Sequence, residues 1–299
     1  MLAAALEPSG EGTYLKFFLD TATESDDPSH FVILFLMGMM RLLPILAITP
    51  FFGARILPHP VKAAMGITLY LILMPHILLT TSTTMTVNLT LFTYGIKELF
   101  IGSLMGILAS VPFFIAETAG IYIDHQRGGS SLMVQDPHLQ NQDSPLGIIW
   151  NYILIVTFYV LDGQFIFIEA IIRSYTLVPI DAWFSNIFFE DDSMFWEQIM
   201  GIMAYVMRVG IKIGSPALLT ILMTEVFLGI ANRLAPNVMI TFLGMPLKSL
   251  FGLGIICLGW GYITNQMKYE MMTWLIKLQE MVEMFGYGFR PGEGAVPWQ

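Results

Sequence analysis

Six long apolar runs, each interrupted by charged residues or prolines, constrain the fold of this chain more than any other feature. They cover approximately Phe31–Thr49, Ala63–Thr80, Leu89–Ala116, Leu146–Ile172, Glu197–Gly229 and Val238–Ile263. About 20 consecutive apolar residues are enough for a helix to cross a bilayer, and several of these runs reach that length. The sequence therefore predicts an all-α, membrane-associated protein.

The charged residues inside these runs are poorly suited to contact with lipid. A charge at the bilayer centre costs about 2.5–3.5 kcal/mol on insertion scales. Glu169 and Arg173 are four residues apart and can pair on one helix face, whereas Arg208 and Lys212 carry the same sign and need partners elsewhere. Ten charged residues interrupt the apolar runs in this way: Arg41, Lys97, Glu98, Asp162, Glu169, Arg173, Arg208, Lys212, Glu225 and Lys248.

Prolines and small residues in the runs indicate the same environment. A proline removes a backbone N–H donor, and backbone left without a partner is tolerated at membrane depth only where protein or water covers it. Such prolines are Pro44, Pro75, Pro112, Pro216 and Pro246. Small residues at four-residue spacing, Gly102/Gly106/Ser110 and Gly210/Gly214, permit close helix contact. We expect most of these helices to face other protein, inside the chain or between subunits.

Composition excludes several classes of protein. Charged residues make up 12% of the chain, about half the 25% typical of soluble domains. A net charge of −9 argues against a basic nucleic-acid surface. The single cysteine, Cys257, and the five histidines show no metal-binding, H-E-x-x-H or G-x-S-x-G pattern. We expect no enzyme activity, no cofactor, no metal and no nucleic-acid partner.

The chain divides into three parts on composition. Residues 1–30 are acidic and lack the basic start and apolar core of a signal peptide, so we expect a solvated segment or a short surface helix. Residues 31–263 contain the apolar runs. Residues 264–299 predict an amphipathic helix to about Phe285, followed by a Gly/Pro-rich tail.

Three stretches carry a resemblance to a known family. They are Arg41–Pro44 with Pro50–Gly53, Pro58, Lys62 and Pro75; Glu117–Gly128 with Asp136-Pro137 and Ser144-Pro145; and Pro216–Glu225 through Asn232-Arg233 and Ala235–Asn237 to Leu243–Ser249. Together they resemble the FliR/SctT family of the export apparatus of flagella and type III secretion injectisomes. The amino-acid sequence of residues 123–128 resembles the injectisome branch of the family more closely than the flagellar branch.

The resemblance implies an architecture and a set of partners. Members resemble an SctR-like part joined to an SctS-like part, and they form bent helical hairpins around a pore. They assemble with SctR-like and SctS-like (FliP-like and FliQ-like) subunits into a helical export gate for unfolded secreted proteins, with an SctU-like (FlhB-like) subunit at its base. The expected location is the bacterial inner membrane, with the gate largely raised toward the periplasmic side.

The resemblance also implies a pore plug in the loop after the third apolar run, here about residues 117–145. Glycines in such a loop permit backbone conformations closed to other residues, and apolar side chains in a narrow lumen can seal it by dewetting. The expected plug residues are Glu117, Gly120, Asp124, Gln126, Arg127, Gly128, Gly129, Ser130, Ser131, Leu132, Met133, Asp136 and Pro137.

A second group of residues is expected at subunit contacts. For Glu225, Arg233 and Lys248, ion pairs between subunits and ion pairs within the chain both remain open. The group is Arg41, Pro44, Gly102, Gly106, Pro216, Glu225, Gly229, Asn232, Arg233, Pro236, Met245, Pro246 and Lys248.

The main alternative is a stand-alone secondary transporter or proton channel. Carboxylates within the runs and the loop could form a proton relay, and discontinuous helices are typical of transporters. No inverted internal repeat is evident in the sequence, which counts against this alternative. The candidate relay residues are Glu117, Asp124, Asp162, Glu169 and Glu225.

Overall fold

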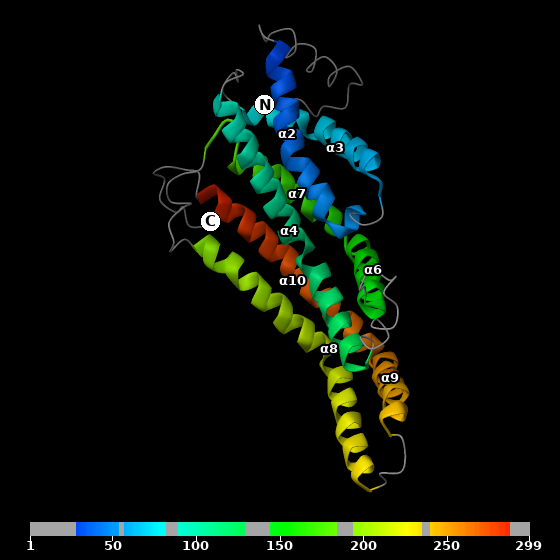
Figure 1. Ribbon diagram of the computed structural model, residues 1–299. Coiled ribbons are helices and arrows are strands. Elements are labelled where there is room, and N and C mark those ends of the chain that lie inside the picture. Colours follow the sequence, from blue (N-terminus) through cyan, green and yellow to red (C-terminus); the bar gives the residue numbers. More distant parts are fainter. Residues whose placement is uncertain are drawn as a thin grey trace. The chain divides into compact units, whose positions relative to one another are not determined.

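The computed structural model describes residues 28–53, 57–81, 89–128, 144–183, 194–234 and 240–287. Within these ranges all regular structure is helical, with eight α-helices and one short 3-10 turn (Figure 1). They are α2 (Pro28–Ile48), η1 (Pro50–Phe52), α3 (His59–Thr80), α4 (Leu89–Gln126), α6 (Pro145–Val160), α7 (Gly163–Leu177), α8 (Met194–Leu234), α9 (Ile240–Leu258) and α10 (Trp260–Tyr287). The predicted all-α class is confirmed.

The helices follow the order of the six apolar runs, with two helices in each of the fourth and sixth runs. By length and composition, α2, α3, α4 and α8 could each cross a membrane. Two further candidates are bent pairs: α6 and α7 meet at 77°, and α9 and α10 meet at 68°. If each bent pair is one span, the described residues contain six.

The break between α6 and α7 has a local cause. Asp162 adopts a left-handed backbone conformation with φ of 56°, which a right-handed helix cannot continue and which Asp tolerates better than most residues. Gly163 follows, and a Cβ there would lie 2.5 Å from the Phe158 ring. The chain can therefore turn tightly over Phe158 only because residue 163 has no side chain.

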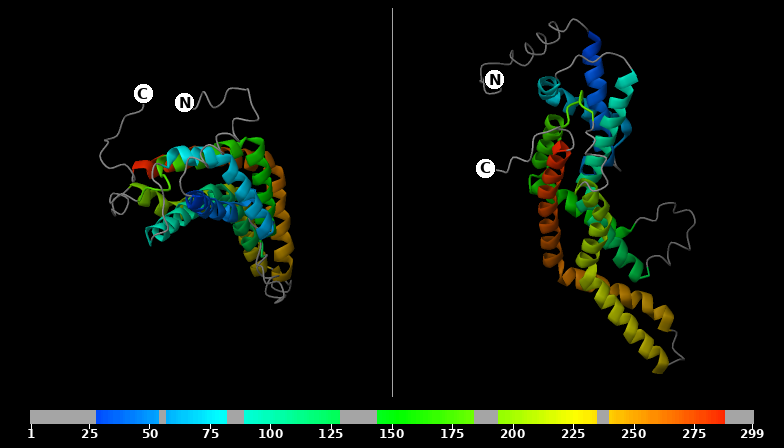
Figure 2. Two further views of the ribbon diagram at one scale, coloured as in Figure 1. Left: turned by 90° about the horizontal axis from the view of Figure 1, so that it is seen from above. Right: turned by 90° about the vertical axis from the view of Figure 1, so that its left-hand side faces the viewer.

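The described helices fall into two compact units. The first lies within Met1–Ile107, Glu169–Glu190 and Val282–Gln299, and the second within Leu108–Ile168 and Asp191–Met281. The first unit contains α2, α3 and the beginning of α4. In the second unit α8 and α9 lie side by side, as both sets of views show (Figure 1 and Figure 2).

Small residues bring α2 and α4 close together in the first unit. A Cβ on Gly102 would collide with the backbone carbonyl of Arg41, and one on Gly106 would lie 3.1 Å from the Cβ of Ile48. The spacing of these glycines therefore creates a helix crossing inside the chain, where main chain packs on main chain.

Two predicted boundaries differ from the structure. The loop expected from Glu117 begins about ten residues later, because α4 continues to Gln126. Ala119 and Ile123 are fully buried, so the polar residues around them belong to one face of a helix that remains packed. The last apolar run is divided between α9 and α10, so the C-terminal helix starts at Trp260 rather than after Thr264.

Candidate functional site

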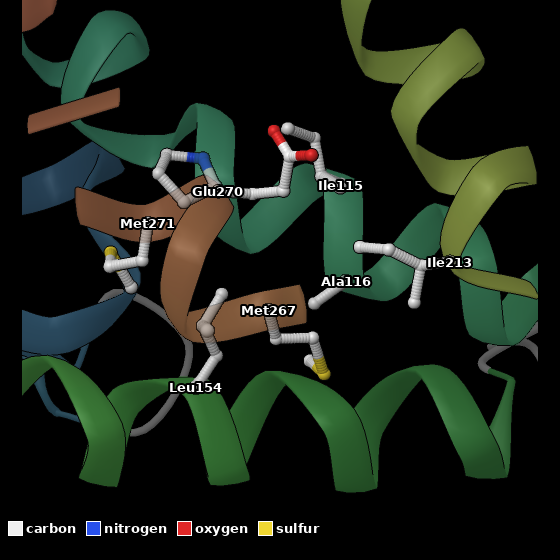
Figure 3. Close-up of a pocket in the computed structure, with 8 residues that line it drawn as sticks. Ile115, Ala116, Leu154, Ile213, Met267, Glu270 and Met271 are labelled. Carbon is white, nitrogen blue, oxygen red and sulfur yellow. The ribbon is translucent and has the colours of Figure 1, made fainter. Parts of the chain in front are cut away.

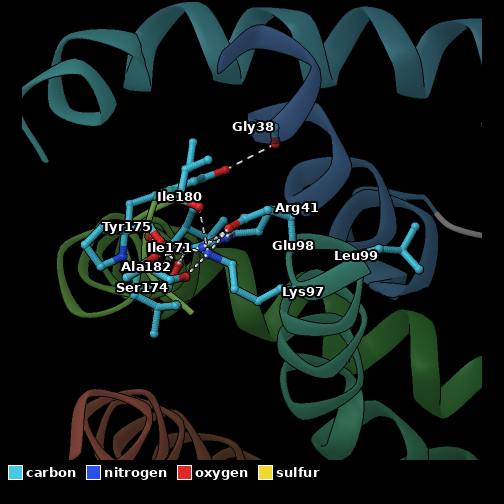
Figure 4. Close-up of polar contacts among 12 residues, drawn as sticks. Gly38, Arg41, Lys97, Glu98, Leu99, Ile171, Ser174, Tyr175, Ile180 and Ala182 are labelled. Atoms are coloured by element: carbon cyan, nitrogen blue, oxygen red, sulfur yellow. Dashed lines mark hydrogen bonds and ion pairs between the residues drawn. The ribbon is translucent and has the colours of Figure 1, made fainter. Parts of the chain in front are cut away.

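The first unit contains a cluster of three charged side chains that is closed to solvent. Arg41 comes from α2, and Lys97 and Glu98 come from α4 (Figure 4). The Nε and Nη2 atoms of Arg41 donate to the two carboxylate oxygens of Glu98 at 2.5 and 2.8 Å, and Lys97 Nζ lies 2.9 Å from Glu98 Oε1. All three side chains are 0% exposed. A paired, charge-assisted geometry of this kind is the arrangement that lets charges stay buried.

The end of α7 and the turn after it complete the cluster around Lys97. Two cations and one carboxylate leave a formal charge of +1, and the carbonyls at the C-terminal end of a helix carry partial negative charge and lack helical donors. Lys97 Nζ donates to three backbone oxygens in the turn that follows α7, those of Pro179, Ile180 and Ala182, at 2.8, 3.0 and 2.8 Å. Backbone dipoles therefore offset the excess positive charge.

Arg41 is held by the same segment. Its Nη1 donates to Ser174 Oγ at 3.2 Å and its Nη2 to the Val178 carbonyl at 2.8 Å. The guanidinium also lies 4.1 Å from the centre of the Tyr175 ring, within the range of a cation–π interaction. The cluster thus joins α2, α4 and α7, and its contacts stabilise the packing of these helices.

A second charged group joins the end of α4 to the start of α6. Asp124 is 4% exposed. Its Oδ2 accepts hydrogen bonds from Ser144 Oγ and, at 3.1 Å, from the Leu146 backbone N–H, while its Oδ1 accepts from Arg127 Nε at 2.7 Å. Ser144 also caps α6 by accepting from Gly147 N–H at 3.0 Å. One carboxylate therefore joins the end of α4 to the start of α6.

Some of the expected plug residues lie within the part of the chain that the structure describes, and others lie outside it. Glu117, Gly120, Asp124 and Gln126 lie in the last turns of α4, and Arg127 and Gly128 form the turn after it. Gly128 has a φ of 93°, in the left-handed region where glycine is favoured. The others lie outside the described residues: Gly129, Ser130, Ser131, Leu132, Met133, Asp136 and Pro137.

A third charged group surrounds Glu270 of α10 in the second unit. Its Oε1 accepts from Lys212 Nζ at 3.1 Å and from Gln266 Nε2 at 2.8 Å, and its Oε2 accepts from Tyr205 Oη at 3.1 Å. The Glu270 side chain is 8% exposed, but that of Lys212 is 56% exposed. The sequence indicated only that Lys212 needed a partner, and nothing in it singled out Glu270 as that partner.

Glu270 also lines a small cavity between α4, α6, α8 and α10 (Figure 3). The cavity measures about 10 Å³, which is room for roughly one water molecule. Its wall is otherwise apolar, formed by Pro112, Ile115, Ala116, Leu154, Ile213, Met267 and Met271. A cavity of this size and lining holds no substrate-sized ligand.

Several residues expected at subunit contacts make contacts within the chain. Arg41, Gly102 and Gly106 are packed inside the first unit. Lys248 Nζ lies 2.7 Å from Glu225 Oε1 across the α8–α9 pair, so these two residues form an ion pair within the chain.

The remaining members of that group lie nearer the surface. Pro44 and Pro216 are half-buried, while Gly229, Asn232, Arg233, Met245 and Pro246 are exposed or half-exposed. Pro236 lies outside the described residues.

Three of the five candidate relay carboxylates form separate pairs. Glu169 bonds to Arg173 at 2.9 Å, Asp124 to Arg127 and Ser144, and Glu225 to Lys248. Arg173 also contacts Glu283 at 2.7 Å within the first unit. Within the described ranges, no group of three or more His, Cys, Asp or Glu side chains is placed to hold a metal ion. These three carboxylates therefore act as local anchors.

Long apolar helices with internally paired charges define this chain as a helical membrane protein of several spans. Residues 32–274 match the family described as "Bacterial export proteins, family 1". The chain belongs to this family, the FliR/SctT family of export-apparatus membrane proteins, which are not enzymes.

Relatives come from both secretion systems and flagella. The chain is 28% identical to Yop proteins translocation protein T of Yersinia pestis over 51% of this chain and 57% of that protein. It is 28% identical to surface presentation of antigens protein SpaR of Shigella flexneri over 54% of this chain and 59% of that protein. It is 23% identical to flagellar biosynthetic protein FliR of Aquifex aeolicus over 86% and 96%. The chain thus spans less than two thirds of the length of the first two relatives. Because its identities to the secretion proteins and to the flagellar protein are similar, they define the family but do not distinguish its injectisome branch from its flagellar branch.

Proposed function

We propose that this chain is a structural and gating subunit of a type III secretion export gate in the bacterial inner membrane. In this proposal it helps to form, and to plug, the conduit through which unfolded secreted proteins leave the cell. The observation that carries the proposal is the family match over residues 32–274. The preference for the injectisome branch over the flagellar branch rests on the amino-acid sequence of residues 123–128.

The proposed architecture joins an SctR-like part and an SctS-like part in residues 31–263. The two bent helix pairs support it, because such bends suit hairpins that line a pore. The surface of α8 supports assembly with SctR-like, SctS-like and SctU-like subunits. Arg208 and Glu225 are exposed on this helix, and so are large apolar residues such as Phe227. A surface that mixes charged and apolar side chains is better suited to contact with protein and water than with lipid. In this proposal such contacts are available because the gate is raised toward the periplasmic side.

The proposed plug is the segment that follows α4. The Asp124 junction supports this assignment, because it joins the end of α4 to the start of α6, the two helices that flank the segment. A segment anchored at both ends can close a pore without loosening the helices that carry it.

Deletion of Gly128–Met133 tests the plug. The assembled complex should form in normal yield but conduct ions when reconstituted into planar bilayers. A second variant replaces the same six residues with a Gly/Ser linker, which keeps the length between Asp124 and Ser144. Unchanged conductance in both variants would remove the plug assignment.

A flux assay separates the proposed function from the stand-alone transporter. The purified chain, reconstituted alone in vesicles, should move neither protons nor small solutes. A saturable flux from the chain alone would replace the export-gate proposal.

A further inference from the structure

Pro112 interrupts the hydrogen bonding of α4 at a buried position. Proline has no N–H, so the bond from residue 112 to the carbonyl of Leu108 cannot form, and the ring pushes that carbonyl away from the helix axis. Leu108 is fully buried, and α4 runs on without interruption to Gln126. A buried carbonyl without a donor is destabilising, so this position requires a donor from outside the helix.

Trp274 of α10 supplies that donor. Its indole Nε1 donates to the Leu108 carbonyl oxygen at 2.7 Å, a short distance for a bond of this type. The Trp274 side chain is 2% exposed, so water does not compete for either partner. The bond joins residues 166 positions apart in the sequence.

The indole is oriented by its neighbours in the second unit. The Trp274 ring stacks on Tyr205, with centres 5.3 Å apart and planes at 27°. The Tyr205 hydroxyl in turn donates to Glu270, one turn before Trp274 on α10. The ring plane, and with it the direction of the N–H, is therefore set by α8 as well as by α10.

Pro216 of α8 shows the ordinary solution to the same problem. It removes the donor for the Lys212 carbonyl, and the hydroxyl of Ser215, in the same helix, donates to that carbonyl at 2.8 Å. This repair is local and ties α8 to nothing else. At Pro112 the replacement donor comes from a different helix, so the repair also acts as a connection.

We propose that Trp274 is a positioning residue that replaces the missing N–H of Pro112 and thereby fixes α10 on α4. This role goes beyond the export function and does not depend on the plug. It makes a specific prediction: the contribution of the Trp274 N–H to stability depends on whether residue 112 is a proline.

A double-mutant cycle in the full-length chain tests the proposal. Trp274→Phe removes the N–H, and Pro112→Ala restores the helical donor to the Leu108 carbonyl. With Pro112 present, Trp274→Phe should lower the melting temperature, followed by circular dichroism in detergent, by about 5 °C. In the Pro112→Ala background the same change should cost well under half of that. The loss of ring stacking is common to both backgrounds, so the difference isolates the hydrogen bond.

Two controls complete the experiment. Trp260→Phe changes a 42% exposed tryptophan on the same helix, and its effect should not depend on residue 112. Ser215→Ala with Pro216→Ala repeats the cycle at the local repair. An equal cost of Trp274→Phe in both backgrounds would overturn the proposal.

A direct measurement covers the case in which Pro112→Ala does not fold. In the chain carrying ¹⁵N-tryptophan, the indole resonance that Trp274→Phe removes should exchange its proton far more slowly than that of Trp260. Exchange as fast as that of Trp260 would also overturn the proposal.

Discussion

The two units of this protein bury charge in different ways. In the first unit, Arg41, Lys97 and Glu98 are all 0% exposed, and every formal charge is met by another charge or by carbonyls at the end of α7. In the second unit, Glu270 is 8% exposed but its partner Lys212 is 56% exposed. One network is closed, and the other keeps one end open.

The difference teaches what full desolvation requires. Two buried charges attract each other strongly only when additional hydrogen bonds satisfy their remaining donors and acceptors. The closed cluster meets that condition with several backbone carbonyls of the segment that follows α7. The half-open network avoids the requirement, because the ammonium group of Lys212 can reach solvent. The closed cluster should therefore tolerate change far less well.

Removal of the single carboxylate of the closed cluster should have the largest effect. Glu98→Gln keeps the shape of the side chain but removes the carboxylate that pairs with both buried cations. We expect a loss of about 3–5 kcal/mol in the free energy of unfolding, seen as low yield and rapid proteolysis in detergent. Glu169→Gln is the matched control, because Glu169 is 51% exposed in its pair with Arg173. That change should cost less than about 1 kcal/mol.

Helix contacts should show the same contrast at a smaller scale. Gly102→Ala places a methyl group against the backbone of Arg41, which cannot move without opening the closed cluster. We expect a loss of about 1–3 kcal/mol, measured by chemical unfolding. At Gly229 of α8 nothing lies within 4 Å of the position that a Cβ would take. Gly229→Ala should therefore leave the isolated chain unchanged or stabilise it by about 0.5–1 kcal/mol.

The half-open network should give the smallest effect. In Glu270→Gln the amide oxygen can still accept from Tyr205, and Lys212 can turn toward solvent. We expect a loss of about 1–2 kcal/mol, again by chemical unfolding, and less than that for Lys212→Met. A loss as large as that of Glu98→Gln would show that exposure of one partner does not relieve the cost, and the comparison would fail.

Much of the fold could be predicted because it is local. Length and apolarity predicted the helices, and i,i+4 spacing predicted the Glu169–Arg173 pair, which the structure confirms. The charges inside the runs also indicated burial against protein, as Arg41, Lys97 and Glu98 show. Each of these inferences uses only residues within one or two turns of a helix.

The contacts that define the clusters could not be predicted in this way. Arg41 pairs with Glu98 across a separation of 57 residues in the sequence, and Trp274 donates to Leu108 across a separation of 166 residues. The partners of Lys97 are backbone carbonyls, which every residue possesses and no sequence pattern marks. The continuation of α4 past Glu117 was hidden for a similar reason, because burial of Ala119 and Ile123 depends on the helices around them.

The closed cluster also has a consequence for the order of synthesis. It needs Arg41, then Lys97 and Glu98, and finally the carbonyls up to Ala182, so it cannot be completed until that last segment has left the ribosome. During that interval α2 and α4 carry charges that lipid would reject. Translation therefore separates two events: the synthesis of the helices that carry these charges, and the later arrival of the backbone carbonyls that complete their hydrogen bonding.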